Sequence, residues 1–143
     1  MSLLEPTPWL VLLAGAHLGF QLTVDRVVYP ALAEVGHERW AGAHAAHSRR
    51  ITPVVAVIYP PLVLVVAWQL VAHPAVAAGW LAAAGTLVAV VTTALVAAPT
   101  HGRLGRGADE QERARLLRRL ARADHVRTAG ALVAVAGAVL LLA

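Results

Sequence analysis

The sequence predicts an all-α fold, an integral membrane up-down-up-down four-helix bundle in which helices 2 and 4 are extended at the cytoplasmic side. Three observations lead to this prediction. Hydrophobic residues make up 59% of the 143 residues and charged residues only 14%, whereas soluble domains carry about 25% charged residues. The hydrophobic residues form four long runs, and the arginines are confined to two segments of the chain. Since this length suits one domain, we expect a single four-span domain over residues 1–143.

The four hydrophobic runs give the expected spans. A helix that crosses a membrane needs about 20 residues, because it rises about 1.5 Å per residue through a hydrocarbon core of about 30 Å. The first run follows Glu5 without a preceding basic residue, so we expect a retained helix rather than a signal peptide. The expected spans are residues 8–33, 40–72, 75–99 and 110–143.

The positions of the basic residues, all of them arginines, predict the orientation. They lie in two groups, one between the apolar runs 8–24 and 51–72 and one between the apolar runs 75–98 and 129–143, and neither terminus nor the turn at His73-Pro74 has any. Basic residues favour the cytoplasmic side, so we expect the inner membrane, with both termini outside. The groups are Arg26, Arg39, Arg49 and Arg50, and then Arg103, Arg106, Arg113, Arg115, Arg118, Arg119, Arg122 and Arg127.

The segment before the last hydrophobic run predicts an amphipathic helix that continues into the fourth span. Leu116 and Leu120 share one face of residues 109–128, and the arginines lie mostly opposite. The apolar run after residue 128 covers only about 22 Å of the hydrocarbon core. We therefore expect Asp124, Arg127 and Thr128 to lie at membrane depth and to face the bundle, the alternative being a tilted helix or a thinned membrane.

The first span carries a row of polar residues, and polar groups inside a membrane bundle suggest function. His17, Gln21, Asp25 and Tyr29 follow one another at intervals of four residues, which places them on one slowly drifting face. The simpler alternative is a hydrogen bond that fixes helix packing. Two glycines four residues apart, Gly15 and Gly19, also predict a close helix contact.

The second span predicts the wall of a pocket. Trp40, His44 and His47 share one face at the start of this helix, although solvated interfacial histidines are the alternative. Prolines remove backbone donors and kink helices, which opens space beside Tyr59. These prolines are Pro53, Pro60 and Pro61.

Further polar residues flank the last two spans. Pro99 is expected to end the third span and to leave His101 in the following loop. The simpler interpretation of Asp124 and Arg127 is that they pair with each other. His125 lies between them in the sequence. Since the expected topology places most of these residues at one end, we predict a pocket that a hydrophobic molecule enters from the cytoplasmic leaflet.

The histidines raise the alternative of a metal site. His44, His47, His101 and His125 supply neutral imidazoles that suit copper, iron or zinc. Bis-histidine haem in the bundle is a less favoured form of the same idea. The chain has no cysteine, so thiolate chemistry is excluded. Either no cofactor is required or one transition-metal site is present.

Several short motifs resemble the DUF1772 group of small four-span membrane proteins, which includes the anthrone oxygenase-like proteins of aromatic polyketide pathways. The motifs are QLTVDRVVYP, WAGAHAAHSRRITPVV, APTHGRL and ADHVRTAG, in this order. The family pattern falls on Gln21, Tyr29, Pro30, His44, His47, Arg49, Arg50, Ile51, Pro99, His101, Arg127 and Thr128. Asp124 and His125 depart from it, because the family has Asn and Trp there.

The resemblance implies a membrane-bound oxygenase that acts on a phenol-like or anthrone-like molecule with dioxygen. His44 is then the expected base, supported by His47 or His125. Arg50 and Arg127 would stabilise the resulting anion, and Asp124 would orient His125 or Arg127. The remaining polar and aromatic residues would contact the substrate: His17, Gln21, Asp25, Tyr29, Trp40, Tyr59 and Thr128.

Other functions and partners follow from the same observations. A non-catalytic membrane subunit or a small-molecule carrier is the alternative from another class. Small residues on the last helix, Gly130, Ala134 and Gly137, would support contacts within the chain or in a homo-oligomer. The lipid bilayer is an expected partner and nucleic acid is not, because topology accounts for the arginines and aromatic residues near them are scarce.

Overall fold

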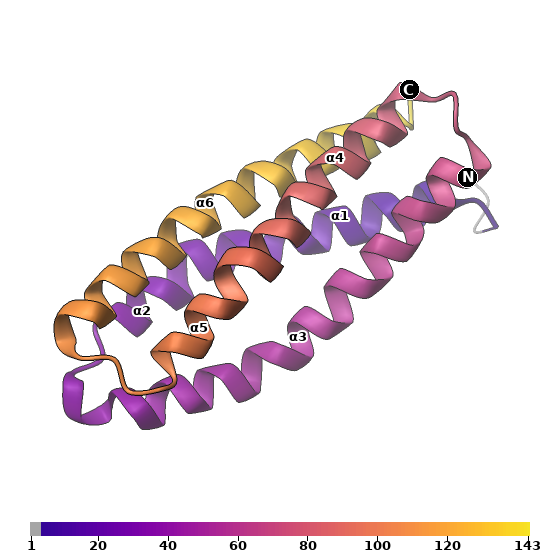
Figure 1. The fold of residues 1–143 in the computed structure, drawn as a ribbon. Helices are drawn as coiled ribbons and strands as arrows, with labels where there is room; N and C mark the ends of the chain where they lie inside the picture. Colours follow the sequence, from indigo (N-terminus) through magenta and orange to yellow (C-terminus); the bar gives the residue numbers. More distant parts are fainter. Residues whose placement is uncertain (1–3) are drawn as a thin grey trace.

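The computed structural model describes residues 4–143, and this part of the chain is all-α, without strands (Figure 1). Four helical segments are long and apolar enough to cross a membrane: Pro6–Ala33, His37–Ala72, Ala77–Leu104 and Glu110–Leu140. Their large exposed side chains are mainly Leu, Val and Trp, as expected for surfaces that face lipid. The prediction of an all-α protein with four such helices is confirmed.

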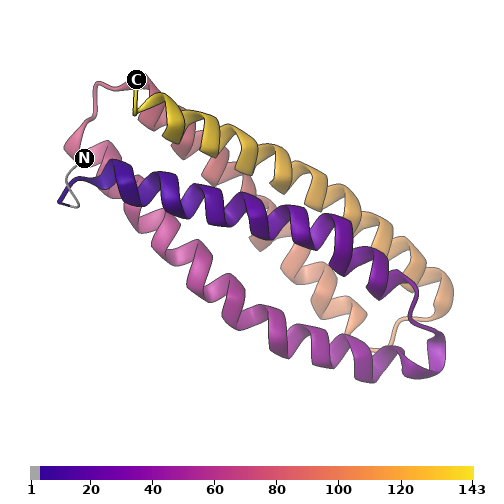
Figure 2. The same ribbon diagram turned by 180° about the vertical axis from the view of Figure 1, so that it is seen from behind.

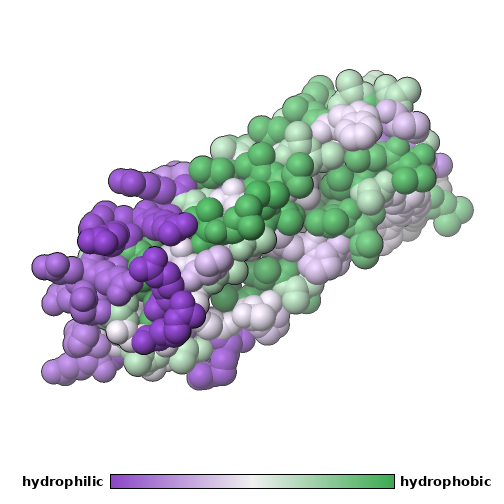
Figure 3. Space-filling model, in the orientation of Figure 1, coloured by the Kyte–Doolittle hydropathy of each residue, from purple (hydrophilic) through white to green (hydrophobic). Residues whose placement is uncertain are grey.

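The hydrophilic surface gathers at one end of the molecule. Figure 3 shows this end opposite the two chain termini, which lie together in Figures 1 and 2. The helices α3 (His37–Ala72) and α6 (Glu110–Leu140) both begin at this end. Asp109 caps α6, where its side chain accepts a hydrogen bond from the backbone N–H of Glu112 at 2.8 Å. This is the arginine-rich end, and it also contains the candidate site.

Two π-helical turns interrupt the first and third long segments. The turn η1 (Val24–Val28) separates α1 (Pro6–Thr23) from α2 (Tyr29–Ala33), and η2 (Thr93–Ala97) separates α4 (Ala77–Thr92) from α5 (Ala98–Leu104). Each turn precedes a proline, Pro30 or Pro99, whose missing N–H leaves a carbonyl of the preceding turn without its usual partner. The wider π turn absorbs this mismatch without ending the helix.

The continuous third segment corrects one prediction. Pro99 does not end the third span, because the helix continues through it to Leu104. His101 consequently lies on a helix rather than in a loop. A proline is tolerated in the first turn of a helical segment, and α5 begins only one residue before Pro99.

The closest packing in the bundle joins α4 to α6. Buried glycines and alanines line both sides of this contact and let the two backbones approach each other. A Cβ atom at Gly85 would overlap the backbone of Gly130 and Ala134, and one at Gly137 would overlap the backbone of Ala82. The small residues of α6 therefore form a contact within the chain. In contrast, Gly15 and Gly19 have open space beside them.

The bundle interior has two apolar parts with a polar layer between them. One apolar cluster includes Leu10, Leu62 and Ala138 near the termini, and the other includes Trp40 and Leu120 near the arginine-rich end. The residues of the polar layer are buried: His17, Gln21, Asp124 and Arg127. This layer adjoins the candidate site.

Candidate functional site

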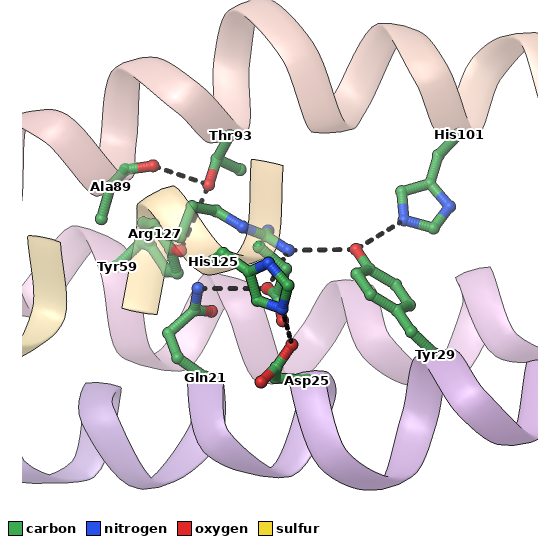
Figure 4. Close-up of polar contacts among 10 residues, drawn as sticks. Gln21, Asp25, Tyr29, Tyr59, Ala89, Thr93, His101, His125 and Arg127 are labelled. Carbon is green, nitrogen blue, oxygen red and sulfur yellow. Dashed lines mark hydrogen bonds and ion pairs between the residues drawn. The ribbon is translucent and has the colours of Figure 1, made fainter. Parts of the chain in front are cut away.

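An ion pair between Asp124 and Arg127 of α6 forms the centre of the polar layer. Asp124 is fully buried and Arg127 is 6% exposed. Arg127 also donates to the hydroxyl of Tyr29 at 3.0 Å, and Gln21 Nε2 donates to Asp124 Oδ1 at 3.4 Å. Buried charges are tolerated only when paired and hydrogen-bonded. The prediction that Asp124 and Arg127 face the bundle interior is confirmed, and Figure 4 shows Arg127 reaching towards Tyr29.

A chain of hydrogen bonds leads from this ion pair to the histidines. The Tyr29 hydroxyl lies 3.4 Å from His101 Nε2, and His101 Nδ1 lies 3.3 Å from His44 Nε2. The chain thus joins α6 to α2, then to α5, and finally to α3. It brings together residues that are far apart in the sequence, as the predicted pocket requires.

The chemistry of each donor fixes the directions that this chain can take. Arg127 only donates, so Tyr29 accepts from it and has one hydrogen left to give. If that hydrogen goes to His101 Nε2, a neutral His101 donates from Nδ1 to His44 Nε2. If Tyr29 donates its hydrogen elsewhere, His101 donates from Nε2 to Tyr29 and accepts at Nδ1 from His44 Nε2. His44 Nδ1 then carries no hydrogen and is a free acceptor. The chain of hydrogen bonds can therefore carry a proton between His44 and Tyr29.

A cavity of about 620 Å³ opens beside these groups, between α3 and the segment formed by η2 and α5, and residues of α1, η1, α2 and α6 also line it. The lining is largely apolar, as is typical of sites for small hydrophobic ligands. The polar and aromatic side chains that line it are Phe20, Tyr29, Trp40, His44, His47, Ser48, Thr52, Thr93, His101, Arg106 and Arg127. Trp40 stacks on His44 with ring centroids 5.4 Å apart, and its Nε1 donates to the Leu104 carbonyl at 3.3 Å.

Several buried polar atoms have no hydrogen-bond partner among residues 4–143. Among the residues of the cavity wall these atoms are His47 Nε2 and Arg127 Nε. In the polar layer they include both ring nitrogens of His17, Gln21 Oε1 and Asp124 Oδ2. Buried polar atoms are normally satisfied by protein, water or ligand. His47 Nε2 therefore has an unused hydrogen-bonding position in the cavity wall.

The hydroxyls of Tyr59 and Thr93 join α3 to η2 at the inner limit of the cavity, 3.2 Å apart. Thr93 also bonds the Ala89 carbonyl at 2.8 Å, and a carbonyl can only accept. The single hydroxyl hydrogen of Thr93 is used there, so Tyr59 donates to Thr93. Tyr59 also contacts His17 edge to face, with ring centroids 4.8 Å apart.

Some predicted site residues lie outside the cavity lining. Arg50 is exposed at the surface of α3. The side chain of His125 is 69% exposed and pairs with Asp25 at 3.2 Å, away from the other histidines (Figure 4). Consecutive helical positions point about 100° apart, so His125 cannot share the inward direction of Asp124. Six further predicted residues are buried or half-buried without lining the cavity: His17, Gln21, Asp25, Tyr59, Asp124 and Thr128.

The imidazole rings of His44, His47 and His101 form one group. Their ring centroids lie 5.5 to 6.5 Å apart in pairs. The fourth predicted metal ligand, His125, is not part of this group. Residues 4–143 contain no three histidine or acidic side chains already arranged to hold a metal ion.

Several residues of the site region were not predicted from the sequence, and Thr93 and Arg113 are two of them. Thr93 lines the cavity from η2. Arg113 is only 8% exposed, donates to His37 Nδ1 at 3.2 Å, and lies over the Trp40 ring at 5.3 Å from its centroid. Arg113 precedes Leu116 by three residues and Leu120 by seven, so the helical period that identified the apolar stripe would also have included it.

Comparison with known proteins gives no match: no protein-family model, curated protein or solved structure matches this chain. The fold and the site therefore define its class by themselves. It is a helical membrane protein with a hydrophobic cavity, an imidazole group in the cavity wall, and a buried ion pair behind it.

Proposed function

We propose that the chain is a membrane-bound oxygenase that acts on a hydrophobic, phenol-like or anthrone-like molecule in the cavity. The observation that carries this proposal is the hydrogen-bonded chain from Arg127 through Tyr29 and His101 to His44, which ends in the wall of that cavity. The resemblance to the anthrone oxygenase-like proteins supports the same reaction.

The proposed reaction begins with proton removal. His44 takes a proton from an activated C–H group of the substrate at Nδ1, the ring nitrogen on the side of Gly105 in the cavity wall. Arg127 and the unpartnered His47 Nε2 hold the oxygen atoms of the substrate. The electron pair of the broken C–H bond remains on the substrate as an enolate or phenolate.

Dioxygen is the oxidant in the second half of the reaction. The anion adds to it and forms a carbon–oxygen bond and a peroxide, which must gain a proton. The proton taken by His44 reaches Tyr29 through His101, and the Tyr29 hydroxyl delivers it. Loss of water from the peroxide leaves a carbonyl group, so that R₂CH₂ and O₂ give R₂C=O and H₂O.

Replacement of His44 by alanine tests this assignment. General acid–base groups typically contribute about 10² to 10⁴-fold to rate, so we expect His44→Ala to lose at least about 10²-fold in turnover. Dioxygen consumption by the purified protein in lipid nanodiscs, with anthrone as substrate, measures this. His73→Ala is the matched control, because His73 pairs with Glu5 at the opposite end of the bundle. Full turnover by His44→Ala with unchanged assembly would exclude His44 as the base.

A histidine-ligated metal enzyme is the second candidate function. The proximity of the His44, His47 and His101 rings favours it, since small side-chain rotations would turn imidazoles towards a shared copper, iron or zinc ion. Metal analysis of the same preparations distinguishes the two candidates, and a visible spectrum tests for haem. Stoichiometric metal that His47→Ala removes would support this candidate. Binding of substrate without any turnover would instead support a carrier.

The proposed orientation is an up-down-up-down bundle in the inner membrane, with its arginine-rich end in the cytoplasm. The distribution of the twelve arginines supports it. The chain has no cysteine, so a single introduced cysteine reports on which side of the membrane its position lies. We expect an impermeant thiol reagent on intact cells to label Ala75→Cys but not Glu34→Cys, and both variants after permeabilisation. Both positions are exposed, and labelling of Glu34→Cys in intact cells would reverse the orientation.

A further inference from the structure

A second hollow lies along the same pair of helices as the cavity. It has a volume of about 480 Å³ and lies between α3 and α4, nearer the chain termini. Its walls include Val63, Val66 and Leu70 of α3 and Ala83, Leu87 and Val90 of α4. None of the residues that line this outer groove carries a charge, and its exposed surface is almost entirely apolar.

The cavity and this outer groove follow one seam between the two helices. On the long helical segment Ala77–Leu104, Thr93 of the cavity, the first residue of η2, lies about one helical turn from Val90 of the groove, which is on α4. On α3, Val55 of the cavity and Val63 of the groove are separated by Tyr59, one turn from each. The hydrogen bond between Tyr59 and Thr93 therefore crosses the seam between the two spaces.

We infer that the two spaces take the two parts of one amphiphilic molecule, a phenolic ring with a long hydrocarbon tail. The ring occupies the cavity beside His44 and Arg127, and the tail extends past Tyr59 into the outer groove. This inference rests on the proposed function, because the ring is the substrate of the proposed oxygenase.

The change in lining along the seam supports this occupant. The cavity presents imidazole, guanidinium and hydroxyl groups, whereas the groove presents mainly aliphatic side chains, with Trp80 and Thr86 among them. Along α4 the groove extends from Trp80 to Val90, which corresponds to about 15 Å of helix and suits an extended alkyl or prenyl chain. A ring without a tail would fill only the cavity. The rival occupant of the groove is an acyl chain of an ordinary membrane lipid.

A binding experiment with two probes separates these possibilities. The probes are a benzoquinone with a decyl tail and the same benzoquinone without it, and their binding in nanodiscs is followed by quenching of tryptophan emission. Trp40 lines the cavity and Trp80 lines the groove, so both spaces have a reporter. Ala83→Phe fills the groove, and Leu87→Trp is a second filling variant in case the first does not fold. Ala136→Phe is the matched control, because Ala136 is exposed on α6 and lies in neither space.

We expect Ala83→Phe to weaken binding of the tailed quinone about tenfold relative to Ala136→Phe, because the added ring displaces the tail contacts. Binding of the tail-less quinone should be the same in both variants. Because Ala83→Phe and Ala136→Phe are compared with the same tailed quinone, partitioning of the tail into the membrane affects both measurements equally. Equal binding of the tailed quinone by both variants would assign the groove to membrane lipid and overturn the inference, while the proposed function would stand. Failure of the wild-type protein to bind the tailed quinone would also overturn the inference, whereas the proposed function is tested separately by the turnover of anthrone.

Discussion

Removal of either member of the Asp124–Arg127 pair is expected to destabilise the fold by about 3–5 kcal/mol, because the remaining charge is left buried without its partner. Asp124 is fully buried, and the Arg127 side chain is 7% exposed. The single variants Asp124→Leu and Arg127→Met each leave one such charge. Unfolding in a titration with a denaturing detergent measures the loss.

The double variant Asp124→Leu/Arg127→Met should recover most of this stability, because an apolar pair needs no charge compensation. It should not recover turnover, since Tyr29 loses its guanidinium partner. The neighbouring pair of Asp25, in η1, and His125, in α6, is the control, because the side chain of His125 is largely exposed. Asp25→Leu should cost no more than about 1 kcal/mol. A double variant as unstable as the single variants would show that charge pairing is not the reason for the loss.

Addition of a single methyl group at Gly137 or Gly85 is expected to separate α4 from α6. A Cβ atom at either position would overlap backbone atoms of the facing helix, which cannot move aside as a flexible side chain can. Overpacking of this kind costs about 1–3 kcal/mol or more. Gly137→Ala and Gly85→Ala should therefore unfold at a lower concentration of denaturing detergent than the wild-type protein.

Replacement of Gly15 or Gly19 by alanine is expected to change stability in the opposite direction. A Cβ atom there meets nothing within 4 Å, and alanine is favoured over glycine in a helix by about 0.5–1 kcal/mol. Gly15→Ala and Gly19→Ala should be neutral or slightly stabilising in the same titration. Marked destabilisation at these two positions would indicate a contact with another chain, because the surrounding protein leaves them open.

Hydropathy and periodicity were sufficient to predict the helical architecture. The length of each apolar run indicated four helices, and the apolar stripe of residues 109–128 predicted that the fourth helix begins before its hydrophobic part, as α6 does. The same stripe, with the shortness of the last run, predicted the inward direction of Asp124 and Arg127. These predictions succeeded because they depend on local spacing alone.

The partners of the inward-facing groups could not be predicted in the same way. Nothing in the sequence indicates that Arg127 reaches Tyr29 or that Gln21 reaches Asp124, since these contacts depend on how four helices pack. The inclusion of His125 with the other histidines ignored the helical period, which turns it away from Asp124. The extension of the third helix past Pro99 was missed because the π turn that permits it has no clear signature in residue type.

The two π turns make the site sensitive to the number of residues as well as to their identity. Each turn holds more residues than an α-helical turn, and so it rotates the segment after it about the helix axis. Tyr29 and His101 both follow such a turn, one on α2 and one on α5, and both belong to the hydrogen-bonded chain. Loss of one codon within Val24–Val28 or Thr93–Ala97 would swing one of these side chains away while the rest of the bundle keeps its register. Small insertions and deletions, rather than substitutions, are thus a direct evolutionary route by which a bundle of this shape gains or loses its chemistry.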